Sequence, residues 1–248
     1  MFVAERKIIL VTGRPLDDGT QLEIVDKSDQ ATLCPSIKEF PTTLEKAMSG
    51  VLNDKLIVCG GSTTKRRKDS TNKCHKLEKN GEWSTLQQGL KEVKHDGAAA
   101  IVVIGREEYL WITGGRDASG KPLRTTDLLS PSGSISVGKD LPDKGRNAHC
   151  MLVFDTQVLM IGGFTGAGHS NSVLLFDSAD GFSHKEGPSM NNRRVYHSCS
   201  TMVSPTHQGR TVAVVAGSFY GDPDGDDGRD TAEILDFTVP GSSWELSK

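Results

Sequence analysis

The sequence predicts an all-β fold made of a four-stranded unit that repeats along the chain, and two observations carry this prediction. Short apolar runs that end in glycine recur at intervals of 48, 54, 48 and 54 residues, at Gly13, Gly61, Gly115, Gly163 and Gly217. Polar turns bound these runs, and no segment shows a sustained helical period. Four-stranded units of about 50 residues are typical of β-propeller blades arranged around a central channel.

The fourth unit illustrates how the strands are assigned. Its first strand is the apolar run 149–154, and its second is the glycine-ended run 158–163. A polar loop leads to the third strand at 172–177, and in other units a tryptophan, Trp83 or Trp244, opens the fourth strand. The whole chain, 1–248, is expected to be one propeller domain. Its repeats extend approximately over 1–44, 45–96, 97–146, 147–195 and 196–248.

The glycines at the strand ends have a physical explanation. A strand that ends near a propeller axis has to turn sharply while other blades crowd against it. Glycine accepts a positive φ freely and allows another backbone to approach closely. A structural role is therefore predicted for Gly60-Gly61, Gly114-Gly115 and Gly162-Gly163, and for the degenerate copies Thr12-Gly13 and Ala216-Gly217.

Taken together, these features resemble the kelch-repeat family of β-propellers. The resemblance is carried by the glycine ends, the late tryptophans, and the segments RNAHC (146–150) and RRVYHSC (193–199) ahead of two first strands. It covers essentially the whole chain. Residues 1–13 align without a gap on 151–163, but nothing precedes Met1 to complete the first strand. We therefore expect an incomplete ring or a piece of a longer protein, with a degenerate five-bladed ring as the alternative.

The resemblance implies a partner-binding face built from the loops between strands. In kelch adaptors an arginine that opens a blade's first strand points at the ligand, which carries a binding role over to Arg146 and Arg194, with Lys94 at about the same place. Arginine bonds carboxylates in pairs, and the alternative is a salt bridge within each blade. The loops after the glycines differ strongly, as recognition surfaces do. They add Arg116, Phe164, Phe219 and Tyr220 to the partner-binding candidates.

The expected function is a non-enzymatic protein-interaction module without a cofactor. No G-x-S-x-G, HExxH, P-loop or Rossmann pattern is present. The net charge of −3 and the lack of a long apolar run give no indication of a nucleic-acid or membrane partner. The alternatives are a substrate-receptor fragment of a BTB-kelch ubiquitin ligase adaptor, a secreted kelch-like protein and a sugar-processing propeller enzyme. An open seam in the ring would favour a homodimer.

Two groups of residues are of types that can bind metal ions. Asp222, Asp224, Asp226 and Glu233 have the spacing of an EF-hand calcium loop. Asp227 occupies the position that needs glycine, however, and Glu233 falls in a predicted strand, so a solvated acidic loop is favoured. The histidines that follow each arginine by three residues, His149 and His197, are expected to make hydrogen bonds between blades.

The five cysteines are odd in number and contain no CxxC pair. The favoured interpretation is a cytoplasmic protein with reduced, buried thiols. In the alternative, the chain is an N-terminally truncated extracellular protein. Cys150 and Cys199 would then lie on neighbouring inner strands, where a disulfide requires Cα atoms within about 7 Å of each other.

Overall fold

The computed structural model describes residues 37–63, 69–219 and 228–247 in full, and describes the backbone of four strands within residues 1–36. Helix in these residues is limited to two 3-10 turns, Pro205–His207 and Gly228–Asp230. No helix in the described part of the chain has the length and hydropathy needed to cross a membrane.

The strands form four-stranded antiparallel sheets, each made of four consecutive strands in chain order. The first, described by its backbone, comprises β1 (Phe2–Ala4), β2 (Lys7–Val11), β3 (Leu22–Val25) and β4 (Ala31–Leu33). The second comprises β5 (Met48–Leu52), β6 (Lys55–Cys59), β7 (Cys74–Leu77) and β8 (Trp83–Thr85). The third comprises β9 (Ala98–Ile104), β10 (Glu107–Thr113), β11 (Thr126–Leu129) and β12 (Ile135–Val137). The fourth comprises β13 (Cys150–Phe154), β14 (Gln157–Ile161), β15 (Val173–Asp177) and β16 (Ser183–Glu186). The last comprises β17 (Ser198–Ser204), β18 (Arg210–Ala216), β19 (Ala232–Leu235) and β20 (Glu245–Ser247).

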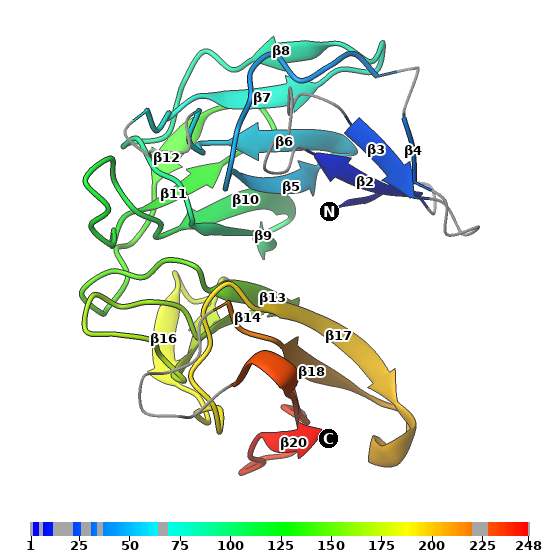
Figure 1. Ribbon diagram of the computed structural model, residues 1–248, viewed down its shortest axis with the longest axis vertical. Helices are drawn as coiled ribbons and strands as arrows, with labels where there is room; N and C mark the ends of the chain where they lie inside the picture. The colour runs from blue at the N-terminus through cyan, green and yellow to red at the C-terminus, as the bar shows by residue number, and fades with distance from the viewer. Residues whose placement is uncertain are drawn as a thin grey trace.

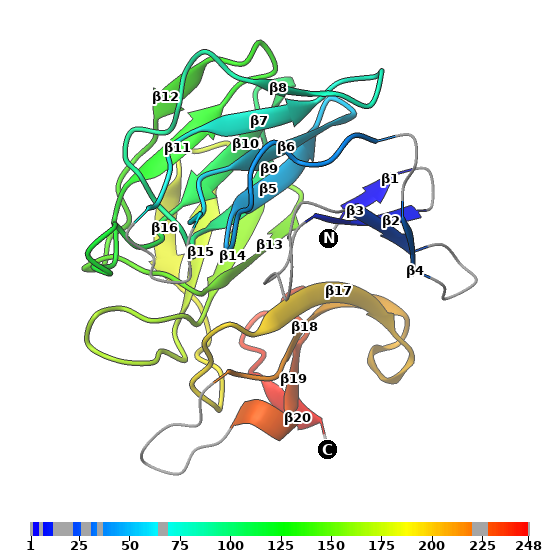
Figure 2. The same ribbon diagram turned by 45° about the horizontal axis from the view of Figure 1, so that its top comes forward.

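The sheets stand side by side around a common centre, as propeller blades do (Figure 1). Strands β5, β9, β13 and β17 contact one another in turn and lie innermost, while β8, β12 and β20 lie at the periphery (Figure 2). The predicted all-β propeller architecture is therefore confirmed. The first strand of the first sheet is short, with three residues in β1 against five in β13.

The hydrophobic core consists of layers between neighbouring sheets. Along β10, Leu110 and Ile112 pack against the second sheet, whereas Trp111 packs against the fourth. This division follows from the alternation of side chains across a strand. Trp111 lies edge-on to Phe176, with ring centroids 5.1 Å apart, and against Phe182 at 4.4 Å. A further layer joins the fourth and last sheets through Leu152, Leu159, Ile161, Val173, Met190, Ala213, Val215, Leu235 and Trp244.

The paired glycines turn the chain where two sheets meet, as predicted. Gly114 and Gly115 have φ values of +57° and +99°. The N–H of Gly115 donates at 2.8 Å to the carbonyl of Arg146, which lies in the connection to the next sheet, and a Cβ on Gly114 would overlap that carbonyl oxygen. The pairs Gly60-Gly61 and Gly162-Gly163 repeat this geometry.

One glycine assignment requires correction. Gly114, the first glycine of its pair, donates its N–H to Thr125 O, and Gly217 makes the equivalent bond to Thr231 O. Gly217 is therefore the first residue of the pair in the last sheet, which is Gly217-Ser218 and not Ala216-Gly217. The reason is that Ala216 still belongs to β18 and pairs with Ser198. The predicted copy Thr12-Gly13 lies outside the described residues.

Candidate functional site

Four residues, each two positions before an inner strand, form a ring around the centre. They are Lys46, Asp96, Ala148 and Tyr196, and all have φ between 52° and 59°. The N–H of Asp96 donates to Lys46 O at 3.0 Å, that of Ala148 to Asp96 O at 2.7 Å, and that of Tyr196 to Ala148 O at 3.0 Å. A positive φ in these residue types costs about 1–2 kcal/mol each. These three backbone hydrogen bonds hold the four residues there and gather their side chains near the axis.

Three side chains of the ring form a charged cluster, hereafter the axial cluster. Lys46 Nζ lies 3.0 Å from Asp96 Oδ1 and donates to the Tyr196 hydroxyl at 2.8 Å. The Tyr196 hydroxyl donates to Asp96 Oδ2 at 2.8 Å. Lys46 Nζ also stands 4.4 Å from the centroid of the Tyr196 ring, a cation–π contact. The Asp96 side chain is buried and that of Lys46 is 25% exposed, so the cluster presents a fixed cation and a phenol to a ligand.

A cavity of about 270 Å³ adjoins the axial cluster and reaches His149 and His197. His149 Nε2 lies 2.9 Å from Thr113 Oγ1 of the third sheet, and His197 Nε2 lies 3.2 Å from Cys150 Sγ of the fourth. The expected hydrogen bonds between blades are therefore present. Burial, assisted by the Arg146 charge and by His197, lowers the pKa of His149 well below its usual range. Burial, assisted by the Arg194 charge, lowers the pKa of His197 to about 4. Both imidazoles are neutral at pH 7.

Around the ring stands a set of rim residues, one after each glycine pair or its equivalent. Each donates its N–H to the carbonyl of the residue just before a ring residue, at 2.7–2.9 Å. The rim residues are Ser62, Arg116, Phe164 and Phe219. Three of the predicted partner-binding residues thus occupy equivalent positions beside the axial cluster. Tyr220, the fourth predicted loop residue, lies outside the described residues.

The rim side chains contact one another and the cluster. The Arg116 guanidinium carbon lies 5.4 Å from the centroid of the Phe164 ring, and Arg116 Nε donates to Asn147 Oδ1 at 2.7 Å. Phe219 is 63% exposed and meets the Tyr196 ring edge-on, with centroids 5.7 Å apart. The rim therefore adds aromatic surface and a second cation to the cation and phenol of the axial cluster.

The other predicted partner-binding cations require correction, because Lys94, Arg146 and Arg194 are buried within the sheets. Each bonds to the second and third strands of its own sheet or to the loop between them. Lys94 pairs with Asp127, and Arg194 with Glu233. The salt bridge within a blade, which was the alternative for Arg146 and Arg194, therefore describes Lys94 and Arg194, whose charges do not point at a partner. Arg146 instead pairs with Asp143 in the connection before β13.

The calcium hypothesis fails at Glu233. Its side chain is fully buried in β19 and accepts hydrogen bonds from Arg194, from the N–H and side chain of Asn191, and from the N–H of Asn192. Its oxygens are therefore already occupied. Asp222, Asp224 and Asp226 lie outside the described residues. In the part of the chain that is described, no three His, Cys, Asp or Glu side chains gather as a metal site would require.

The expectation of reduced thiols is also corrected. Cys59 and Cys74 form a disulfide between β6 and β7, where the strand register places them opposite each other with Cα atoms 4.0 Å apart. Cys150 and Cys199 form a second disulfide between the inner strands β13 and β17, with Cα atoms 6.2 Å apart. Cys34 lies outside the described residues.

The axial cluster was not found from the sequence. A signal for it exists, since Lys46, Asp96 and Tyr196 follow Leu44, Lys94 and Arg194 by two residues, in phase with the repeat. The contact between Lys46 and Tyr196 joins residues 150 positions apart, however, and depends on how far the sheets curve around the axis.

Comparison with known proteins supports the fold. No family model matches the sequence, and no curated protein matches it. A solved structure entitled "Structure of YjhT" matches with a TM-score of 0.76 and 13% identity, over 99% of this chain and 82% of that chain. YjhT is a β-propeller, and the likeness shows that this chain shares its fold. At this identity the likeness concerns the fold alone.

Proposed function

We propose that this chain carries five kelch-type propeller repeats and binds a peptide or protein partner through the axial cluster and the rim residues. The observation that carries the proposal is the meeting of Lys46, Asp96 and Tyr196, which precede the inner strands of three different sheets. The rim residues Phe164 and Phe219 belong to the same face. Exposed aromatic rings next to fixed charges are typical of the residues that dominate binding energy at interfaces.

The chemistry of the site favours a partner segment that combines a carboxylate with an apolar side chain. Lys46 and Arg116 offer cations, and both are already oriented by hydrogen bonds. Such preorganisation reduces the entropy lost on binding. Phe219 offers exposed apolar contact area against Tyr196, and the half-buried Phe164 adds apolar area beside Arg116. The proposed mechanism is recognition without covalent chemistry.

A peptide library displayed on phage and selected against the purified chain tests this proposal. We expect enrichment of peptides with an Asp or Glu near an aromatic or aliphatic residue. Synthetic copies of the enriched peptides should lose at least about tenfold in affinity with the Phe219→Ala variant, because an exposed aromatic anchor is truncated. Binding is measured by fluorescence anisotropy.

The matched control is Val239→Ala, which truncates another exposed apolar side chain in the turn after β19. It should bind the enriched peptides as the wild type does. The proposal is wrong if no peptide is enriched, or if both variants bind with wild-type affinity.

One observation favours a sugar-processing enzyme as a second candidate. The cavity beside the axial cluster is lined by Lys46, Asp96 and Tyr196, side chains able to exchange protons, and its volume of about 270 Å³ suits a small ligand. A panel of neutral and acidic monosaccharides is screened for an increase in Tm. A sugar that raises the Tm of the wild type but not that of Lys46→Met supports this candidate. If no sugar shifts the Tm, none of the sugars tested is a ligand of this cavity.

We further propose that the chain works in an oxidising, extracellular-type compartment rather than the cytoplasm. The disulfides Cys59–Cys74 and Cys150–Cys199 support this, because such bonds persist mainly outside the reducing cytosol. Protein extracted in N-ethylmaleimide should leave these four cysteines unlabelled, and labelling should follow only after reduction. Labelling of all four without reduction would restore the cytoplasmic interpretation.

A further inference from the structure

Three sheets carry one buried cation each, at the position two residues before the ring residue. In the third and last sheets a fully buried carboxylate from the third strand pairs with it. Lys94 Nζ lies 2.9 Å from Asp127 Oδ2, and Arg194 Nη2 lies 3.0 Å from Glu233 Oε1. Each carboxylate also accepts the backbone N–H three residues before the cation, that of Lys91 or Asn191. A buried charge without such a partner is costly.

The fourth sheet lacks this carboxylate. In each sheet a glycine N–H at the end of the second strand donates to the carbonyl two residues before the acidic position. These bonds are Gly114 to Thr125, Gly162 to Ser172 and Gly217 to Thr231. They make Leu174 of β15 the equivalent of Asp127 and Glu233. Arg146 therefore receives no anion from the third strand of its own sheet.

Other groups replace the missing carboxylate as partners of Arg146, but only in part. Its Nε donates to Asp143 Oδ2 at 2.9 Å, and the Asp143 side chain is 22% exposed. Its Nη1 donates to the Gly162 and Ser172 carbonyls and its Nη2 to the Ser172 hydroxyl. A guanidinium has five N–H groups, so one N–H of Nη2 has no partner among the described residues, although Arg146 is only 2% exposed.

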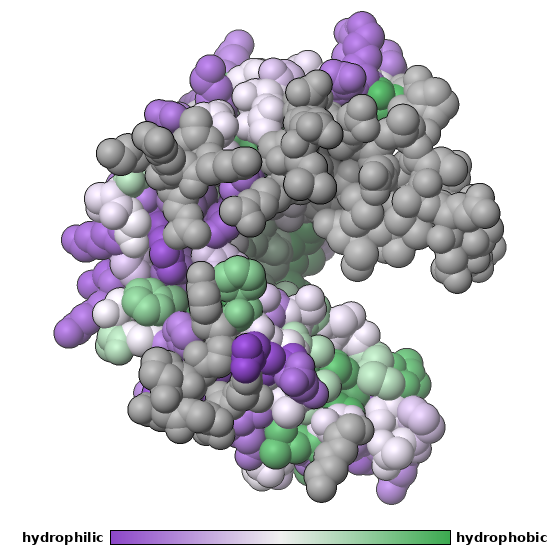
Figure 3. All heavy atoms as spheres, in the orientation of Figure 1, coloured by the Kyte–Doolittle hydropathy of each residue, from purple (hydrophilic) through white to green (hydrophobic). Residues whose placement is uncertain are grey.

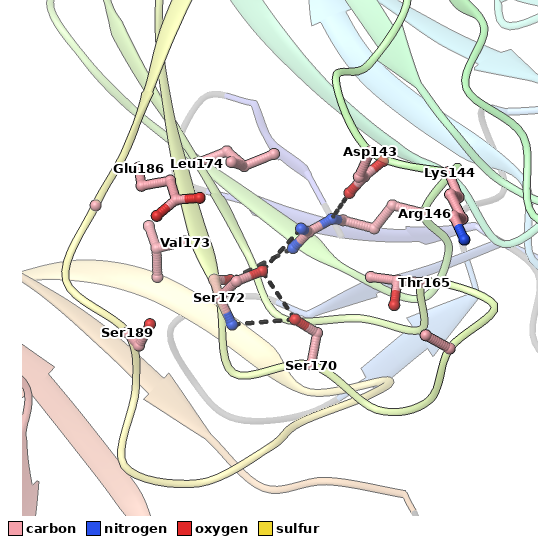
Figure 4. Close-up of a pocket in the computed structure, with 12 residues that line it drawn as sticks. Asp143, Lys144, Arg146, Thr165, Ser170, Ser172, Val173, Leu174, Glu186 and Ser189 are labelled. Atoms are coloured by element: carbon pink, nitrogen blue, oxygen red, sulfur yellow. Dashed lines mark hydrogen bonds and ion pairs between the residues drawn. The ribbon is translucent and has the colours of Figure 1, made fainter.

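A cleft of about 430 Å³ opens where the carboxylate is missing. Figure 4 shows Arg146 reaching across it toward Ser172, with Leu174 and Glu186 on one side and Lys144 on the other. Ser170 and Ser172 contribute hydroxyl groups to the wall, and Lys144 lies exposed at the rim. Lys144 and Arg146 balance Asp143 and Glu186, so the cleft as built carries no excess of negative charge.

We propose that this cleft binds a carboxylate, which takes the place of the side chains that Asp127 and Glu233 supply in the neighbouring sheets. The Ser170 and Ser172 hydroxyls bond to each other at 2.8 Å, which leaves one hydroxyl proton of the pair free. That hydroxyl and the free N–H of Arg146 Nη2 donate to the carboxylate, and Lys144 adds a second positive charge. The carbon skeleton next to the carboxylate lies along Leu174 and Val173. The carboxylate belongs to a small organic acid or to the C-terminus of a peptide. This site is separate from the axial cluster and does not depend on the function proposed for it.

Isothermal titration calorimetry of the full chain tests this proposal with paired ligands. Propionate is compared with propionamide, and Gly-Gly-Leu with its C-terminal amide. We expect the acid of each pair to bind at least about tenfold more tightly than its amide, since a charge-assisted bond to a buried arginine is lost with the amide. Tighter binding of Gly-Gly-Leu than of propionate assigns the site to peptide termini, and the reverse assigns it to small acids.

Leu174→Glu places the missing carboxylate in the cleft and should abolish the preference for acids. Val137→Glu adds the same charge at an exposed position of β12 and should bind as the wild type does. Lys144→Glu reverses a rim charge without touching the core and should weaken acid binding about fivefold. If Leu174→Glu fails to fold, the effect of Lys144→Glu on acid binding tests the proposal. Equal binding of acid and amide by the wild type, or unchanged acid binding by folded Leu174→Glu and by Lys144→Glu, overturns the proposal.

Discussion

At the scale of single residues, the first glycine of each pair is fixed by both its φ and its neighbours. Gly114→Ala places a Cβ on the carbonyl of Arg146 and strains a φ of +57°. The free energy of unfolding, measured by urea titration, should fall by about 2–4 kcal/mol. Gly105→Ala is the matched control, because Gly105 has a φ of +67° but nothing within 4 Å of its Cβ position. It should cost about 1 kcal/mol, and equal losses in the two variants would remove the contact between sheets as the cause.

The buried His197 gives a prediction on pH. Its folded pKa of about 4 lies below the unfolded value of 6.5, so between these values the unfolded chain binds more protons and stability falls as the pH falls. From pH 7 to pH 5 this residue alone should remove about 2 kcal/mol from the free energy of unfolding.

The measurement compares wild type with His197→Asn at both pH values. The variant should lose correspondingly less stability on acidification, while His184→Asn, at an exposed position of β16, should behave as the wild type does. The same acid loss in wild type and His197→Asn would show that His197 does not carry this pH dependence.

At the scale of elements, the buried ion pairs tie the connection between two sheets to the third strand of the next sheet. Glu233→Gln leaves Arg194 without its counter-charge inside the protein. Removal of one partner of a buried pair costs about 3–5 kcal/mol, and urea denaturation should show a loss of this size. Glu82→Gln removes one partner of the exposed pair Lys38–Glu82 and should leave stability unchanged. If the free energy of unfolding falls no more in Glu233→Gln than in Glu82→Gln, the buried ion pair does not stabilise the connection between the sheets.

The elements were predictable because they depend on local patterns, and the site was predictable only in part. Strands such as β10 and β15 follow from apolar runs bounded by turns, and the glycine pairs follow from the sharp turn that ends a strand. The rim residues follow from loop variability. The burial of Arg194 was not predictable. An arginine ahead of a strand gives the same sequence pattern whether its side chain faces a ligand or a carboxylate in β19. The distinction depends on Glu233, which pairs with it only once β18 and β19 have folded back.

At the scale of the whole molecule, the arrangement of layers leaves the last sheet less covered than the fourth. Its inner strand β17 has exposed side chains at five of seven positions, whereas the equivalent β13 has none. Met202 and Val203 are 42% and 66% exposed, and hydrophobic residues show at the surface along this strand at the lower right of Figure 3. The fourth sheet has hydrophobic layers on both faces. Local opening should therefore cost less free energy in the last sheet than in the fourth.

Hydrogen exchange followed by mass spectrometry measures this difference. Amides of β18 should exchange at least about tenfold faster than those of the equivalent strand β14, because fewer buried apolar contacts oppose the opening of their sheet. Both are second strands with hydrogen-bonded neighbours on each side, which makes the comparison direct. Equal protection would mean that another surface covers β17 in solution. The dependence on protein concentration then identifies that surface: protection that weakens on dilution indicates a second copy of this chain, and protection that does not change indicates the chain itself.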